Sequence, residues 1–137
     1  NTFWKVAREL NLEENMKATG KNISLQGELI GEGIQGNPYK IKGQTVRFFT
    51  GFDIDKYKRI SFPELIVMLA DMGLQSVPVL NKEFGFMLPE TVEDMLKYAE
   101  DKSVLNDKTE REGVVIRSMD GTISFKAISN KFLLNEK

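Results

Sequence analysis

The segment from Glu112 to Ser129 places the strongest constraint on how this chain can fold. It reads EGVVIRSMDGTISFKAIS, two runs rich in Val, Ile and Phe that have the composition of half-buried strands. Asp120-Gly121 between the runs favours a turn, so the segment predicts a β-hairpin. Glu112 and Lys126 interrupt the apolar runs. Together they could form one floor for a metal-bound, phosphorylated ligand, and a plain hairpin with two surface charges is the alternative.

The shared floor depends on the register of this hairpin. A three-residue turn at Met119–Gly121, with Gly121 in the left-handed region, would place Val114 opposite Lys126. Glu112 would then lie diagonally across from Lys126 on the same face. A shift of one residue would place the two charges on opposite faces.

A second segment, Asn22 to Asn37, combines strand patterning with a glycine-rich loop. Apolar and polar residues alternate from Ile23 to Leu29, which predicts a strand with one face on the core and the other toward water or a ligand. Glu28 lies on the polar face. The loop GEGIQG lets the backbone turn tightly or approach a partner closely. It is not a known phosphate-loop signature, and a plain hairpin connection is the alternative.

The segment VRFFTGFDI, residues 46–54, predicts a third strand whose two faces differ. Simple alternation puts four residues on an apolar face: Val46, Phe48, Thr50 and Phe52. It puts four on a polar face: Arg47, Phe49, Gly51 and Asp53. Phe49 is therefore the single aromatic residue on the polar face, with Gly51 leaving room beside it. The alternative is that Phe49 packs beneath a neighbouring helix.

Taken together, these segments resemble the later motifs of ATP-dependent RNA ligases. QGELIGEGIQGN, VRFFTGFDID, EGVVIR and SFKAISNKF occur in the order and spacing of that family, from about Asn22 to Phe132. The covalent nucleotidyltransferase superfamily also contains DNA ligases and mRNA capping enzymes, but GELxGxGIQGN is more similar to the RNA ligase form. The resemblance implies an α+β nucleotidyltransferase fold, with antiparallel sheets and flanking helices.

The resemblance also implies roles for particular residues around ATP and Mg²⁺ or Mn²⁺. Glu28 would contact the ribose, and Phe49 would stack on the adenine, with Phe52 as the second choice. Glu112 would be a catalytic carboxylate near the metal. Lys126 would neutralise the α-phosphate during transfer, where preorganised charge contributes most.

Two positions depart from the common family pattern. Arg117 closes the EGVVIR strand where relatives often have lysine, so it would be a second cation on the phosphates of the nucleotide. Many relatives carry Lys-x-Lys in the last motif, whereas Lys126-Ala127-Ile128 keeps only the first lysine. This difference leaves the subfamily and the catalytic strength open.

The KxDG motif that carries the family's nucleophilic lysine is absent. The lysines before Glu28 are Lys5, Lys17 and Lys21, in other contexts. We therefore expect residues 1–137 to be the C-terminal portion of an incomplete adenylyltransferase domain, inactive alone. The parent enzyme would join RNA 5′-phosphate and 3′-hydroxyl ends through lysyl-AMP. A non-catalytic nucleotide- or RNA-binding module of this fold, or a DNA ligase or capping-enzyme relative, is the alternative.

Composition limits the chemistry further. The chain has no Cys and no His, which excludes disulfides, thiol nucleophiles, Ser-His-Asp triads and the usual zinc sites. A metal would have to be a hard cation on carboxylates and phosphates. No apolar run approaches the roughly 18 residues of a membrane span, and no signal peptide opens the chain. We therefore expect a cytoplasmic protein with no membrane partner.

Charge is unevenly spread along the chain. The net charge of −1 argues against a wholly basic nucleic-acid binder, yet residues 40–59 hold six basic residues and two acidic ones. Tyr39, Phe49 and Tyr57 are interleaved with them. Such a stretch could face a phosphate backbone, and a solvated strand face is the alternative.

Helix signals complete the α+β pattern. We expect Thr2 to cap a first helix, Asn11 to start a second, and Ser61–Glu64 to form a capping box for a third that Gly73 ends. The last two expected elements are a helix that begins at Pro89–Thr91 and a short edge strand at Val77–Leu80.

Overall fold

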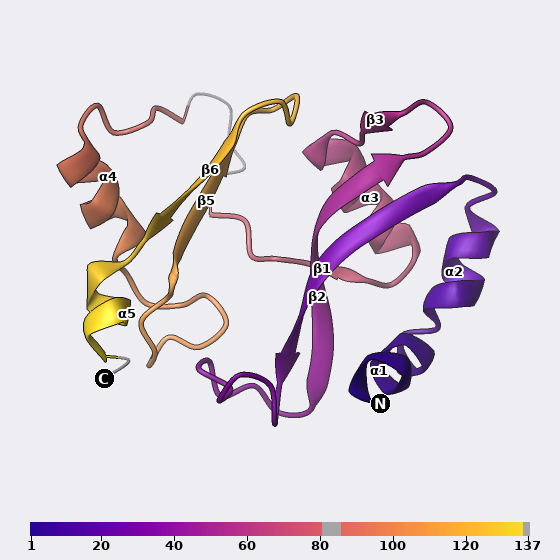
Figure 1. Ribbon diagram of the computed structural model, residues 1–137, viewed down its shortest axis with the longest axis horizontal. Helices are drawn as coiled ribbons and strands as arrows, with labels where there is room; N and C mark the ends of the chain where they lie inside the picture. Colours follow the sequence, from indigo (N-terminus) through magenta and orange to yellow (C-terminus); the bar gives the residue numbers. More distant parts are fainter. Residues whose placement is uncertain (81–85, 136–137) are drawn as a thin grey trace.

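The computed structural model describes residues 1–80 and 86–135, which form two β-sheets with helices outside them (Figure 1). The elements, in chain order, are α1 (Thr2–Glu9), α2 (Leu12–Ala18), β1 (Ile23–Gly31), β2 (Gln44–Asp53), β3 (Lys58–Arg59), α3 (Phe62–Asp71), β4 (Gln75–Ser76), α4 (Val92–Ala99), β5 (Gly113–Arg117), β6 (Ser124–Ile128) and α5 (Asn130–Asn135). The expected α+β class, with antiparallel sheets and flanking helices, is confirmed. No helix in this part of the chain is long and apolar enough to cross a bilayer.

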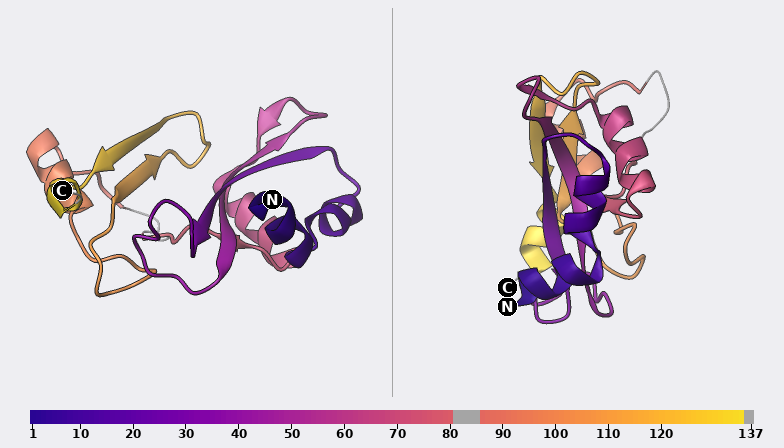
Figure 2. Two further views of the ribbon diagram at one scale, coloured as in Figure 1. Left: turned by 60° about the horizontal axis from the view of Figure 1, so that its bottom comes forward. Right: turned by 90° about the vertical axis from the view of Figure 1, so that its right-hand side faces the viewer.

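The molecule is layered as helices, sheet, sheet, helices. Figure 2 shows this order from α4 and α5, through the β5–β6 hairpin and the β1–β2 sheet, to α1, α2 and α3. The larger core lies between the β1–β2 sheet and helices α1, α2 and α3. Its buried members are Ile23, Phe48, Ile60, Leu65, Leu69, Met72 and Leu74. A smaller core beneath the hairpin consists of Ala99, Val114 and Ala127. The two sheets therefore face each other with their helices on the outside.

The first sheet contains an irregularity at Phe49. Strands β1 and β2 are antiparallel, but Gln26 lies opposite Thr50 while Gly27 lies opposite Phe48. Phe49 is therefore an extra residue in β2, a β-bulge, which breaks the alternation of faces. Val46 and Phe48 pack on the core as predicted. Beyond the bulge the predicted faces are wrong.

Gly51 illustrates the change of face. A Cβ atom added to Gly51 would lie 3.0 Å from Leu65 Cδ1 and 3.1 Å from Ile60 Cδ1. Gly51 therefore faces α3 and the core, and not a polar face shared with Phe49. The extra residue at the bulge is the physical reason, because it reverses the parity of every position that follows.

The hairpin turn differs from its prediction by one residue. Val115, rather than Val114, lies opposite Lys126, and Ser118 pairs with Ile123 around a four-residue loop. Gly121 has a φ of 75°, as expected. The wider loop is held from inside by the Asp120 carboxylate, which accepts hydrogen bonds from three donors: the Ser118 hydroxyl, the Thr122 hydroxyl and the Thr122 backbone N–H.

Some local predictions at the element ends were wrong. Asn1, rather than Thr2, caps α1, because its Oδ1 accepts from the N–H groups of the first helical turn. Ser61 is the N-cap of α3, but its side chain makes no capping bond, so there is no capping box. The expected edge strand at Val77–Leu80 is replaced by β4, which pairs in parallel with β2.

Candidate active site

Glu112 and Lys126 form an ion pair on the hairpin. Lys126 Nζ lies 2.6 Å from Glu112 Oε1, and the two side chains keep 47% and 46% of their surface exposed. Glu112 immediately precedes β5, and Lys126 lies in β6. The pair is thus formed at the surface of the hairpin, where one carboxylate oxygen of Glu112 remains without an ion-pair partner in the described residues.

The observed register alone would place these two side chains on opposite faces. Gly113 resolves the conflict. A Cβ atom at Gly113 would collide with the Ala127 carbonyl oxygen and lie 2.9 Å from Ile128 Cα. In a regular strand a Cβ points out of the sheet, so the backbone at Gly113 is rotated toward its partner strand. This rotation lets Glu112 reach Lys126: the predicted register was wrong, but the two side chains are in contact.

Tyr39 fixes the backbone of Glu112 from across the molecule. Its hydroxyl oxygen accepts a hydrogen bond of 3.0 Å from the Glu112 N–H. Its carbonyl oxygen accepts another, of 3.1 Å, from Asn106 Nδ2. Tyr39 belongs to the loop between β1 and β2, so these bonds join that loop to the segment before β5. No local pattern in the sequence predicts this contact, because the partners are 73 positions apart in the chain.

The pKa of Tyr39 reports on the charges that surround it. Burial raises this pKa above its ordinary value, and the carboxylates of Glu112 and Glu28 act in the same direction. The Lys126 ammonium and the hydrogen bond from Glu112 oppose the rise. The Tyr39 hydroxyl therefore lies within electrostatic reach of three predicted site residues, and it stays protonated at neutral pH. Glu28 is exposed on β1, opposite Arg47 of β2.

Arg117 contacts the backbone of Phe49 at the bulge. Arg117 Nη1 donates a 2.5 Å hydrogen bond to the Phe49 carbonyl oxygen. Burial lowers the pKa of Arg117, and the nearby Arg59 guanidinium lowers it further. Arg117 thus binds the backbone of the predicted adenine-stacking residue, a role that the sequence did not indicate. Phe52, the second choice, instead packs edge-on against Tyr57, with ring centroids 5.5 Å apart.

A further bond joins the tip of the hairpin to the first sheet. Arg59 Nη1, in β3, donates to the Gly121 carbonyl oxygen at 3.0 Å. Together with the bonds of Tyr39 and Arg117, it holds the hairpin at its base, at the end of β5 and at its tip. These bonds therefore join the sheet that carries Glu28 and Phe49 to the hairpin that carries Lys126, with Glu112 at its base.

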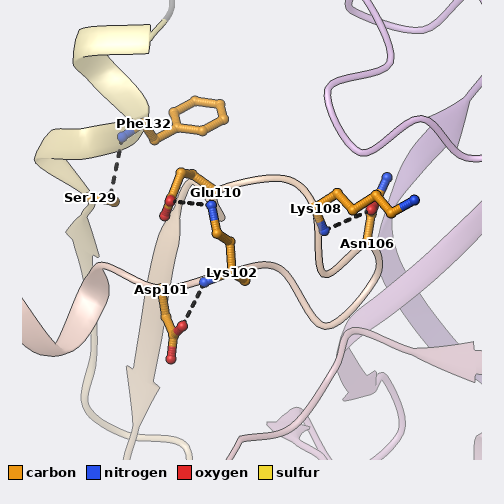
Figure 3. Close-up of polar contacts among 7 residues, drawn as sticks. All are labelled: Asp101, Lys102, Asn106, Lys108, Glu110, Ser129 and Phe132. Carbon is orange, nitrogen blue, oxygen red and sulfur yellow. Dashed lines mark hydrogen bonds and ion pairs between the residues drawn. The ribbon is translucent and has the colours of Figure 1, made fainter.

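The loop that leads into Glu112 is closed by its own polar contacts (Figure 3). Lys102 Nζ lies 2.6 Å from Glu110 Oε1, and the Asp101 carboxylate accepts from the Lys102 N–H. Ser129, just after β6, donates its backbone N–H to the Glu112 carbonyl oxygen at 2.8 Å. Both backbone polar groups of Glu112 are therefore satisfied, which limits how far its carboxylate can move.

Few carboxylates near the ion pair are available to bind a divalent cation. The residues that the structure describes contain no group of three or more acidic side chains able to enclose a metal. Glu112, with Glu28 near Tyr39, fits a hard cation held by one or two carboxylates and completed by phosphate oxygens and water, the common arrangement for Mg²⁺. The predicted role of Glu112 at a metal stays a prediction.

Comparison with known proteins assigns the family. A family model described as RNA ligase matches residues 1–132, so the chain belongs to the RNA ligase family. A Naegleria gruberi RNA ligase mutant with AMP and Mn is 37% identical, with a TM-score of 0.88 over 96% of this chain. Another mutant of that ligase, with ATP and Mn, is 39% identical, with a TM-score of 0.87 over the same share. The chain spans about 40% of the length of both. No curated protein sequence matches the chain.

Proposed function

We propose that this chain is the C-terminal portion of the adenylyltransferase domain of an ATP-dependent RNA ligase, with a nucleotidyltransferase fold. The whole enzyme would seal RNA 5′-phosphate to 3′-hydroxyl ends through lysyl-AMP, using ATP and Mg²⁺ or Mn²⁺. Residues outside this chain would supply the nucleophilic lysine, since the chain contains no KxDG. The proposed role is RNA repair in the cytoplasm.

The ion pair of Glu112 and Lys126 carries this proposal. It is half exposed, so its charges can meet a ligand, yet the backbone of Glu112 is held by Tyr39 and Ser129. Fixed charge of this kind stabilises developing charge at phosphorus-bound oxygens. Lys126 would neutralise the α-phosphate, and Glu112 would orient a metal bound to the phosphates.

The solved relatives support the same pair. One of the Naegleria mutants replaces a glutamate and is described with AMP and Mn, and another replaces a lysine and is described with ATP and Mn. The two replaced residues are 14 positions apart, which is also the separation of Glu112 and Lys126. The equal spacing favours corresponding roles in this chain.

The remaining site residues would bind the nucleoside. Phe49 would stack on the adenine from its bulge, where the hydrogen bond from Arg117 fixes its backbone. Glu28 would contact the ribose from the exposed side of β1. One donor of Arg117 is used by the Phe49 carbonyl oxygen, so we propose that Arg117 mainly positions Phe49. Its remaining N–H groups could still bind the phosphates of the nucleotide.

Substitution of Lys126 tests the proposal in the intact ligase. Lys126→Ala should depress formation of lysyl-AMP from radiolabelled ATP by two or more orders of magnitude, roughly the effect of losing one preorganised electrostatic contact. Lys131→Ala is the matched control, because Lys131 is an exposed lysine on α5. Adenylylation and sealing near wild type in Lys126→Ala would make Lys126 an ordinary surface residue.

A further inference from the structure

The turn between β2 and β3 presents an unusual surface, which we call the turn surface: Lys21, Lys56, Tyr57, Lys58 and Arg59. Tyr57 is at its apex, with 85% of the residue exposed. Its φ of 50° is in the left-handed region, which a residue with a bulky side chain adopts at an energetic cost. A large aromatic ring is therefore exposed to solvent at a position where the backbone is strained.

The Tyr57 ring is oriented by a neighbour. It meets Phe52 of β2 at an interplanar angle of 88° and a centroid distance of 5.5 Å. This edge-to-face contact is a favoured geometry for aromatic pairs and limits the rotation of the exposed ring. One partner stabilises the ring, while most of its surface stays open to a ligand.

The cations of the turn surface lack acidic partners. Within residues 1–80 and 86–135, Lys21, Lys56 and Lys58 form no ion pair. Asp53 and Asp55 accept hydrogen bonds only from neutral amides, from the Lys56 backbone N–H at 2.9 Å and from Asn22 Nδ2 at 3.0 Å, so they keep their charge. Together with Glu64, which lines the same hollow, they still leave the four cations of the turn surface with a net positive charge toward a ligand.

This arrangement contrasts with the lysines on the helices. Lys5, Lys17 and Lys97 each have a glutamate one helical turn away at 4.0 Å or less. Such exposed pairs are weak, but they reduce the local field. The unpaired lysines of the turn surface lie on both sides of the exposed aromatic ring.

The turn surface is continuous with the candidate active site. Arg59 donates to the Gly121 carbonyl oxygen at the hairpin tip. It is also close enough to Arg117 to lower the pKa of that residue, and Arg117 binds the Phe49 backbone. Figure 1 shows β3 and the hairpin tip at the same edge of the molecule. A chain of cations thus leads from Phe49 to Tyr57.

We propose that the turn surface binds single-stranded RNA close to the end being joined, with a base stacked on Tyr57 and phosphates on Lys56 and Lys58. An exposed aromatic ring flanked by cations suits a single strand, because every base has a face that can stack and every nucleotide carries a phosphate. This inference rests on the proposed function and gives its RNA substrate a path across the protein.

The test measures binding of a 5′-phosphorylated single-stranded RNA 12-mer to this chain by fluorescence anisotropy. Tyr57→Ala should weaken binding roughly 5- to 150-fold, which corresponds to the loss of one base–aromatic stack. Tyr57→Phe should bind normally, since it keeps the ring. Replacing Lys56 and Lys58 together with Gln should reduce the slope of log K against log salt by about 1.4, because each phosphate contact contributes about 0.7.

Matched controls separate this surface from general charge and from the nucleotide site. Replacing Lys17 and Lys97 together with Gln makes the same charge change on the helices and should leave RNA affinity unchanged. AMP binding should survive the changes at Tyr57, Lys56 and Lys58. Lys126→Ala should have the opposite profile, with weakened AMP binding and normal RNA binding.

Several results would overturn the inference: no RNA binding by the chain, equal RNA affinity in all variants, or an equal loss in the Lys17/Lys97 control. Displacement of the RNA by an equimolar polyglutamate peptide would also overturn it, because the surface would then recognise negative charge alone. Loss of AMP binding with RNA binding intact would count against the proposed function and not against this surface.

Discussion

Removal of the Tyr39 hydroxyl should abolish the hydrogen bond that holds the backbone of Glu112. Tyr39→Phe keeps the ring and the carbonyl bond to Asn106, so it removes only the acceptor for the Glu112 N–H. A net hydrogen bond contributes about 0.5–1.5 kcal/mol, and a buried donor left unpaired costs about 1–3 kcal/mol. Because Tyr39 and Glu112 are partly buried, we expect the free energy of unfolding to fall by about 1–2 kcal/mol.

Urea denaturation of the chain measures this change, and Tyr57→Phe is the control. The Tyr57 hydroxyl makes no hydrogen bond in the described residues, so its removal should change the unfolding free energy by less than about 0.5 kcal/mol. Hydrogen exchange adds a local readout, because the Glu112 amide should exchange faster in Tyr39→Phe. Equal stability of the two variants, with unchanged protection of that amide, would refute the reasoning.

The stability difference between wild type and Tyr39→Phe should also depend on pH. The pKa of Tyr39 is raised in the folded chain above its ordinary value of 10.0. The folded state therefore favours the protonated phenol, and this contribution is present below pH 10 and lost as pH rises above it. The stability difference between wild type and Tyr39→Phe should shrink above pH 10. A difference that grew there would contradict the assigned cause.

Three further outcomes are expected. Gly113→Ala should lower the unfolding free energy by roughly 1–3 kcal/mol and separate Glu112 from Lys126, because the new methyl group overlaps the partner strand; urea denaturation and NMR would show both effects. Hydrogen bonds from Thr122 and Ser118 lower the pKa of Asp120 to about 2, so their stabilising effect is present above pH 3.8 and lost as the pH falls toward 2. A ¹³C titration of the Asp120 carboxylate should show this midpoint, and the midpoint should be higher in Thr122→Val. The chain alone, with radiolabelled ATP and Mg²⁺, should form no covalent AMP adduct on a denaturing gel, and a stable label would contradict the motif assignment.

The sequence predicted the strands and most of the helices because their signals are local. Alternation from Ile23 to Leu29 and the apolar runs around Asp120 are periodic patterns that depend on neighbours only. The resemblance of the motifs to RNA ligases predicted the family, and the comparisons confirm it. Predictions that depended on counting residues along a strand were less successful.

Two single-residue irregularities explain those errors. The bulge at Phe49 reversed the faces of β2 beyond it, and nothing in VRFFTGFDI marks the extra residue. The Asp120 side chain stabilised a four-residue loop where a three-residue turn was expected. Gly113 then restored the contact that the shifted register would have lost. Tyr39 could not be recognised because its partner Glu112 is 73 positions away in the sequence.

In the part of the chain that the structure describes, the four hydrogen bonds that join the hairpin and the loop before it to the first sheet and its loop have one property in common: each links a side chain to a backbone group. Substitution can delete the guanidinium of Arg117, but it cannot delete the carbonyl oxygen of Phe49 that accepts its hydrogen bond. Each of these hydrogen bonds thus depends on the side chain of one residue only. A backbone carbonyl acceptor keeps its hydrogen bond whatever side chain its residue carries, so a substitution at Phe49 should leave the bond from Arg117, and with it the position of the two sheets, in place.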